Sequence, residues 1–137
     1  MKRVTYETIK NMPKVFTSNT QKIGEIGENE AVKFLMKHGF VVKDRNYTKK
    51  WGEIDIVAEK DSKIYFIEVK SVSVIGNNFR PEENMHPWKL QRLARAIQTY
   101  ILSKNLDGRE WQVDLLVVYL NLKDKNSEIK VVSDIIL

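Results

Sequence analysis

The chain has 137 residues, 42% hydrophobic and 30% charged, which is enough for one domain with a buried core and argues against a disordered protein. Its 23 lysines and arginines against 18 acidic residues give a formal charge of +5. This excess favours polyanionic partners, although a merely soluble basic protein is an equal alternative on charge alone. The absence of cysteine excludes disulfides, thiolate metal sites and cysteine nucleophiles.

No apolar run is long enough to span a bilayer, and the first residues lack the apolar core of a signal peptide. We therefore expect a cytoplasmic protein without a membrane partner. Residues 1–19 carry four basic side chains against one acid, with Pro13 interrupting any periodicity, and predict a basic N-terminal arm. Residues 20–137 show no repeat or linker and predict a single domain.

A first helix is predicted from a capping box that begins at Ser18 to His38-Gly39, where glycine can adopt the left-handed cap. Glu28 lies at the edge of its apolar face, a place where an acid requires a reason. Residues 40–47 predict a strand that decays into a polar turn.

Two further strands are predicted within residues 51–70, joined by a polar turn at 59–63. The Gly, Asn and Pro content of residues 71–81 indicates a loop leading away from the strand end.

A second helix is predicted from Pro87 to about Lys104. Its inward residues would be Leu90, Leu93, Ala94, Ile97, Tyr100 and Ile101. Residues 111–120 predict a strand buried on both faces, and residues 128–137 a last strand at the sheet edge. The order αβββαββ predicts an α/β fold, with one mixed sheet flanked by helices.

The predicted hairpin carries acids that a purely structural hairpin does not need. Because strand side chains alternate between faces, Glu68 and Lys70 point the same way, and pairing of the hairpin can place Asp55 beside Glu68. Two carboxylates beside an ammonium group predict a site for a hard divalent cation such as Mg²⁺ or Mn²⁺. The alternative is a set of salt-bridged acids on a solvent-facing strand.

Phosphodiester hydrolysis is the chemistry for which such a trio is suited. Carboxylates of Asp55 and Glu68 can hold a cation that polarises a phosphoryl oxygen and acidifies a bound water. Lys70 can orient that water or offset the charge growing on phosphorus. Glu28 could bind the ion through water or steer a second ion.

Several different short motifs lie along residues 22–120. They are Gly24-Glu-Ile-Gly-Glu28 with Ala31, Asn46-Tyr47, Gly52-Glu-Ile-Asp-Ile-Val57, Phe66-Ile-Glu-Val-Lys70, Phe79-Arg-Pro81, Lys89 and Val113-Asp114. In order and spacing these motifs resemble the YraN-like family of small bacterial proteins. That family belongs to the restriction-endonuclease-like PD-(D/E)xK superfamily and is similar to the archaeal Holliday junction resolvases.

The resemblance implies a restriction-endonuclease-like fold with metal ligation by Asp55 and Glu68. It also implies a catalytic role for Lys70, an auxiliary role for Glu28, and a basic position of the second helix at Lys89. One departure concerns Ser71-Val-Ser73, which stands where the family commonly has Thr-x-Arg.

Other side chains allow two interpretations each. Lys89, Arg92 and Arg95 form a basic shoulder of the second helix, either a solvated face or a set of phosphate contacts. Asp114 is either a functional family position or a structural hydrogen-bond acceptor. For Trp51 and Trp88, packing in the core or in a lid is favoured over base stacking.

The resulting hypothesis is a Mg²⁺- or Mn²⁺-dependent nuclease that hydrolyses DNA, of branched or Holliday-junction type, in repair or recombination. A homodimer would suit a symmetric junction. The alternative is a catalytically silent or partner-dependent nucleic-acid-binding module on a nuclease fold. A third possibility is a structural protein whose strand acids are paired on the surface.

Overall fold

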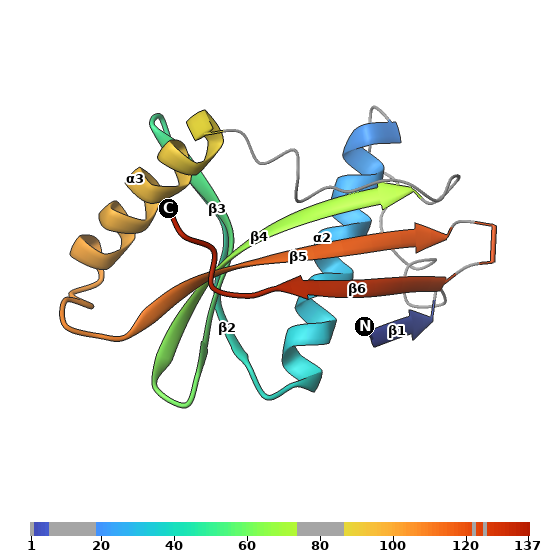
Figure 1. Ribbon diagram of the computed structural model, residues 1–137, viewed down its shortest axis with the longest axis horizontal. Coiled ribbons are helices and arrows are strands. Elements are labelled where there is room, and N and C mark those ends of the chain that lie inside the picture. Colours follow the sequence, from blue (N-terminus) through green and yellow to red (C-terminus); the bar gives the residue numbers. More distant parts are fainter. Residues whose placement is uncertain (1, 6–18, 74–86, 122, 125) are drawn as a thin grey trace.

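The computed structural model describes residues 2–5, 19–73, 87–121, 123–124 and 126–137. Its elements in chain order are β1 (Lys2–Thr5), α2 (Asn19–Lys37), β2 (Val41–Lys49), β3 (Gly52–Lys60), β4 (Lys63–Ser73), α3 (Pro87–Ser103), β5 (Trp111–Asn121) and β6 (Asn126–Val132) (Figure 1). The predicted restriction-endonuclease-like arrangement, a mixed sheet flanked by helices in the order αβββαββ, is confirmed. β1 adds a strand that was not predicted within the basic arm, and residues 6–18 of that arm lie outside the described residues.

All six strands belong to one sheet in the order β1-β6-β5-β4-β3-β2. β4 and β5 pair in parallel, whereas the other neighbours are antiparallel. α3 lies in the connection between the two parallel strands, as parallel pairing requires a crossover. The strand predicted to be buried on both faces is confirmed, because residues 113–118 of β5 are all buried.

The prediction for the last strand was wrong in two respects. β6 ends at Val132, and it lies between β5 and β1 instead of at the sheet edge. The chain then turns towards the start of β5, where the N–H of Asp134 donates to Asp114 Oδ1 at 2.9 Å and the N–H of Ile135 to the Val113 carbonyl at 2.7 Å. The predicted loop at 71–81 also begins later, since β4 continues to Ser73, and residues 74–86 lie outside the described residues.

The end of the first helix and the turn of the hairpin are both marked by residues with positive φ. Gly39 has a φ of 84°, so the predicted left-handed glycine does follow α2. The hairpin turn is tighter than predicted: β3 ends at Lys60 and β4 begins at Lys63, leaving only Asp61 and Ser62 between them. Both have positive φ, 51° and 66°, as in the two-residue turns that match the twist of a hairpin.

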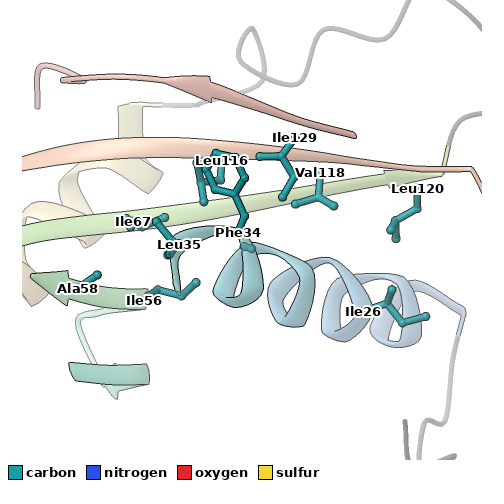
Figure 2. Packing of buried hydrophobic residues seen from close by; sticks show 11 residues of the cluster. Ile26, Phe34, Leu35, Ile56, Ala58, Ile67, Leu116, Val118, Leu120 and Ile129 are labelled. Carbon is teal, nitrogen blue, oxygen red and sulfur yellow. The ribbon is translucent and has the colours of Figure 1, made fainter. Parts of the chain in front are cut away.

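Each helix covers one face of the sheet with its own apolar cluster. Apolar residues of α2 pack on one face, and Figure 2 shows Phe34 and Leu35 among strand residues that include Ile67 and Leu116. The second cluster packs Leu93, Ala96, Ile97 and Tyr100 of α3 against Ile54, Val57, Phe66 and Val113. Neighbouring residues Phe66 and Ile67 belong to opposite clusters, so α2 and α3 lie on opposite faces. No helix in the described part of the chain is long and apolar enough to cross a membrane.

The regular alternation of β3 breaks at Asp55. Ile54 packs in the α3 cluster and Ile56 in the α2 cluster, although residues two apart on a regular strand share a face. Across on β2, Asn46 has a φ of 52° and lies between the paired positions Arg45↔Ile56 and Tyr47↔Ile54. The β3–β4 pairing runs from the turn to Ile56↔Ile67, and beyond it the two strands diverge (Figure 1). We call this point the fork.

Candidate active site

Two carboxyl groups meet at the fork. Asp55 precedes Ile56 and Glu68 follows Ile67, so they occupy the first positions beyond the last β3–β4 pair. Asp55 Oδ2 accepts a 2.8 Å hydrogen bond from the N–H of Val69, and the charge of Asp55 acts on the neighbouring Glu68 carboxyl. Glu68 is only 9% exposed. The structure therefore brings together the two acids predicted from strand alternation.

The closeness of these acids changes their protonation. Burial and the neighbouring charge of Asp55 raise the pKa of Glu68 to about 8, although Lys89 acts in the opposite direction. Burial also raises the pKa of Asp55, while the hydrogen bond from Val69 lowers it. Because two neighbouring carboxylates cannot both ionise cheaply, their closeness favours a protonated form of the pair.

Lysines approach the pair from two elements. Lys89 Nζ, in the first turn of α3, lies 3.6 Å from Glu68 Oε1. α3 can dock this closely on β3 because residue 52 is glycine: a Cβ there would lie 1.9 Å from the Arg92 carbonyl oxygen. Lys70, two positions after Glu68, shares its face of β4.

A cavity of about 550 Å³ opens beside the fork. Residues from α2, β3, β4 and α3 line it, among them Glu28, Asp55, Lys70 and Lys89. These four predicted side chains therefore face a common space. Within the described part of the chain, Glu68 is not among the residues that line it, but it neighbours two that do, Asp55 and Lys89. Arg92 and Arg95 lie further along α3 and are not among the described residues that line the cavity.

Glu28 is buried at the cavity wall and held by β2. Its Oε1 accepts hydrogen bonds from Arg45 Nε (3.2 Å), Arg45 Nη2 (3.0 Å) and Asn46 Nδ2 (3.1 Å). Burial raises the pKa of Glu28, whereas Arg45 lowers it. Sequence reasoning missed both partners, although Asn46 stands in a family-like motif and Arg45 directly precedes it.

The donor set suits a hard divalent cation. No three histidine or acidic side chains among the described residues converge closely enough to hold a metal ion, so the two acids at the fork are the protein's own candidate ligands. Carboxylate oxygens are the ligands that Mg²⁺ prefers, and Mg²⁺ commonly uses one or two of them while retaining waters. The raised pKa values of both acids indicate a place where a cation would compensate negative charge. By these criteria the residues present fit the ion.

Three other predicted side chains have defined surroundings. Asp114 accepts hydrogen bonds from Gln112 Nε2 at 2.7 Å and from the N–H of Asp134. These bonds support the interpretation of this buried acid as a structural hydrogen-bond acceptor. Trp88 is 60% exposed, so the expectation of core packing was wrong for it. Trp51 is 42% exposed, and its Nε1–H donates to Thr99 Oγ1 at 2.9 Å.

Comparison with known proteins identifies relatives across most of the chain. The model of the "Uncharacterised protein family UPF0102", which is the YraN family, matches residues 27–118. The chain belongs to this family. The resemblance predicted from the motifs is thereby confirmed.

UPF0102 relatives come from several bacteria. The chain is 40% identical over 95 residues to a UPF0102 protein of Campylobacter jejuni subsp. doylei, covering 69% of this chain and 81% of that protein. It is 38% identical over 111 residues to one of Sulfurovum sp., covering 80% and 88%. It is 32% identical over 98 residues to one of Persephonella marina, covering 72% and 84%. The UPF0102 match includes Glu28, both fork acids, Lys70 and Lys89, whereas β1 and β6 lie outside it.

Proposed function

We propose that this UPF0102 protein is a divalent-metal-dependent nuclease that hydrolyses phosphodiester bonds of DNA. The observation that carries the proposal is the placement of the acids Asp55 and Glu68 side by side at the fork, with Lys89 3.6 Å from Glu68 and with Asp55, Lys70 and Lys89 lining one cavity. Paired acids with a strongly raised pKa in a cleft are a recognised mark of functional sites.

Each side chain has a role in this proposal. Asp55 and Glu68 would hold Mg²⁺ or Mn²⁺, and Glu28 would act on it through water. The ion, when bound, lowers the pKa of a coordinated water and polarises the phosphoryl oxygen. Lys70 would orient the attacking water or offset the charge that develops on the phosphoryl group.

The positive charge of α3 would hold the nucleic acid. Lys89 Nζ lies 3.6 Å from Glu68 Oε1 in the free protein and can move to a substrate phosphate once a cation occupies the fork. Arg92 and Arg95 continue the basic face of the same helix. Phosphate contacts of this kind position a substrate without reading its sequence.

We propose branched DNA of the Holliday-junction type, encountered in repair or recombination, as the substrate. This part of the proposal rests on the similarity of the family to junction resolvases, which is an analogy of fold. A homodimer would present two such sites to a symmetric junction.

Cleavage assays test the proposal directly. Labelled junction, flap and linear DNA are incubated with the protein in Mg²⁺ or Mn²⁺, alongside Asp55→Asn. We expect metal-stimulated cleavage of the junction by the wild type alone. Cleavage no greater than that of Asp55→Asn on every substrate would contradict the proposal.

A second candidate is a nucleic-acid-binding module that is silent or requires a partner. It is favoured by the engagement of Glu28 with Arg45 and of Glu68 with Lys89, and by Ser73, which stands where the family commonly has arginine. Tight DNA binding that weakens steeply with salt, without metal-stimulated cleavage, would identify this function.

A further inference from the structure

A line of side chains runs along one flank of α3, away from the fork and beside the β2–β3 turn. Trp88, Arg92, Arg95 and Thr99 follow one another at intervals of four, three and four residues, which places them on one stripe of the helix. The buried side of α3 is formed by other residues: Leu93, Ala96, Ile97 and Tyr100. We call the stripe the α3 ridge.

An indole lies at each end of the α3 ridge. Trp88 is 60% exposed and precedes Lys89, the residue paired with Glu68 at the fork. At the other end, Trp51 comes from the β2–β3 turn and is fixed by its 2.9 Å hydrogen bond to Thr99 Oγ1. Its N–H is thus satisfied while 42% of the residue remains exposed.

Charge and spacing indicate what the α3 ridge can bind. Trp88 and Thr99 are eleven positions apart, which is about 16 Å of helix, with Arg92 and Arg95 between the two aromatic ends. Exposed indoles stack on nucleobases, and guanidinium groups between them pair with phosphates. In a duplex the base faces are already stacked on one another, so only unpaired bases can cover an indole.

We infer that the α3 ridge binds unpaired nucleotides of a nucleic-acid strand, stacking bases on Trp88 and Trp51 and leading that strand to the acids at the fork. The inference deepens the proposed function, because it gives the substrate of the same site an unpaired segment. Binding on the α3 ridge does not itself require cleavage.

The test measures binding with cleavage disabled. Asp55→Asn protein in EDTA is titrated into a labelled single-stranded oligonucleotide and, separately, a blunt duplex of the same length. We expect Trp88→Ala to weaken single-strand binding about 5-fold or more, the usual loss for one stacked base, and to change duplex binding less than about 2-fold. Trp88→Phe, which keeps an aromatic face, should retain most of the affinity.

Two controls separate stacking from folding. Trp51→Phe loses the bond to Thr99 but keeps a ring, so it should bind the single strand more tightly than Trp51→Ala. Trp111 is equally 42% exposed but lies on β5 against Phe66, and Trp111→Phe should leave both affinities unchanged. Circular dichroism melting checks that each variant is folded.

Equal weakening on single strand and duplex, or no weakening with Trp88→Ala, would overturn the inference. So would a ridge that binds lipid vesicles but no oligonucleotide. The wild-type cleavage assay is read independently. Trp88-dependent binding without any cleavage would leave the inference standing and remove the nuclease proposal, whereas cleavage with Trp88-independent binding would do the reverse.

Discussion

Among the described residues, the cavity beside the fork and a second cavity both contain acidic side chains, and the acids are arranged differently in each. The second cavity, of about 390 Å³, is lined by residues that include Asp44, Glu59, Tyr100 and Arg109. There Tyr100 Oη donates to Asp44 Oδ2 at 2.5 Å, and Arg109 Nη2 lies 3.3 Å from Glu59 Oε1. Each acid there pairs with a side-chain donor, whereas at the fork Asp55 and Glu68 lie beside each other in addition to their contacts with the Val69 N–H and Lys89. Acids matched by donors stabilise a fold, while neighbouring carboxylates suit a cation.

Protonation distinguishes the two cavities as well. Burial and the hydrogen bond to Asp44 raise the pKa of Tyr100, so this phenol keeps its proton throughout the physiological range. The pKa of Glu68, raised to about 8, lies within that range. The second cavity should therefore keep its charge while the fork changes charge, and four experiments test this difference.

The largest effect is expected from removing one charge at the fork. Asp55→Asn should lower metal-dependent DNA cleavage at least about 100-fold, because a ligand of the proposed ion is lost. Asp44→Asn makes the same chemical change in the second cavity and should leave the rate nearly unchanged. Steady-state cleavage of a labelled junction measures both, and equal losses would refute the contrast.

The stability of the metal-free protein should fall as the pH rises. The pKa of Glu68 is raised from 4.5 to about 8, so between these values the unfolded chain releases a proton that the folded protein keeps. The contribution of Glu68 to stability is full below pH 4.5, is lost by several kcal/mol as the pH rises towards 8, and then levels. Glu68→Gln should flatten this slope in urea denaturation with EDTA. Parallel slopes for the two proteins would show that Glu68 is not the titrating group.

Packing of α2 against β4 positions Glu28 and can be tested with two glycines. A Cβ at Gly27 would lie 1.7 Å from Ser71 Oγ and 2.6 Å from Ser71 Cβ, whereas at Gly24 nothing lies within 4 Å. Gly27→Ala should cost about 2 kcal/mol of unfolding free energy and displace Glu28 from the cavity wall. Gly24→Ala should be neutral or stabilise the helix by up to about 1 kcal/mol. Thermal and urea unfolding compare them, and equal stabilities would contradict the close contact.

The smallest effect is expected in the second cavity. Tyr100→Phe removes the hydroxyl that donates to Asp44 and keeps the ring that packs on Phe66 and Tyr47. We expect a loss of about 1 kcal/mol in stability and no change in DNA cleavage. A large loss of cleavage with folding intact would mean that this cavity also serves the reaction.

Strand periodicity was sufficient to place the central acids. Alternation alone put Glu68 and Lys70 on one face, and hairpin pairing brought Asp55 beside Glu68. Both helices and the glycine after α2 also followed from local signals, since periodicity and caps act over a few residues. β1 has only four residues, too few to show a period, and so it was not predicted.

What the sequence could not show depends on contacts between distant segments. The break of alternation at Asp55 accompanies the positive φ of Asn46 on the neighbouring strand, and no local pattern predicts it. Arg45 reaches Glu28 across 17 positions, and Lys89 reaches Glu68 from another element. Trp88 was expected to pack because aromatic residues usually do, and only the assembled surface showed it exposed.

The tight turn at Asp61 and Ser62 has a consequence for the order in which the protein folds. A two-residue loop costs little entropy to close, so the β3–β4 hairpin should form before β5 pairs in parallel with β4 across the α3 crossover. The two acids would then meet while still in water, and burial would come only when both helices dock. The Ile64 amide donates to the Glu110 carbonyl next to β5, so the alternate amides of Tyr65 and Ile67 are the ones that report on the hairpin. Pulse-labelled hydrogen exchange should accordingly show protection of the Tyr65 and Ile67 amides before those of Leu115 to Val118, and simultaneous protection would exclude such a sequence.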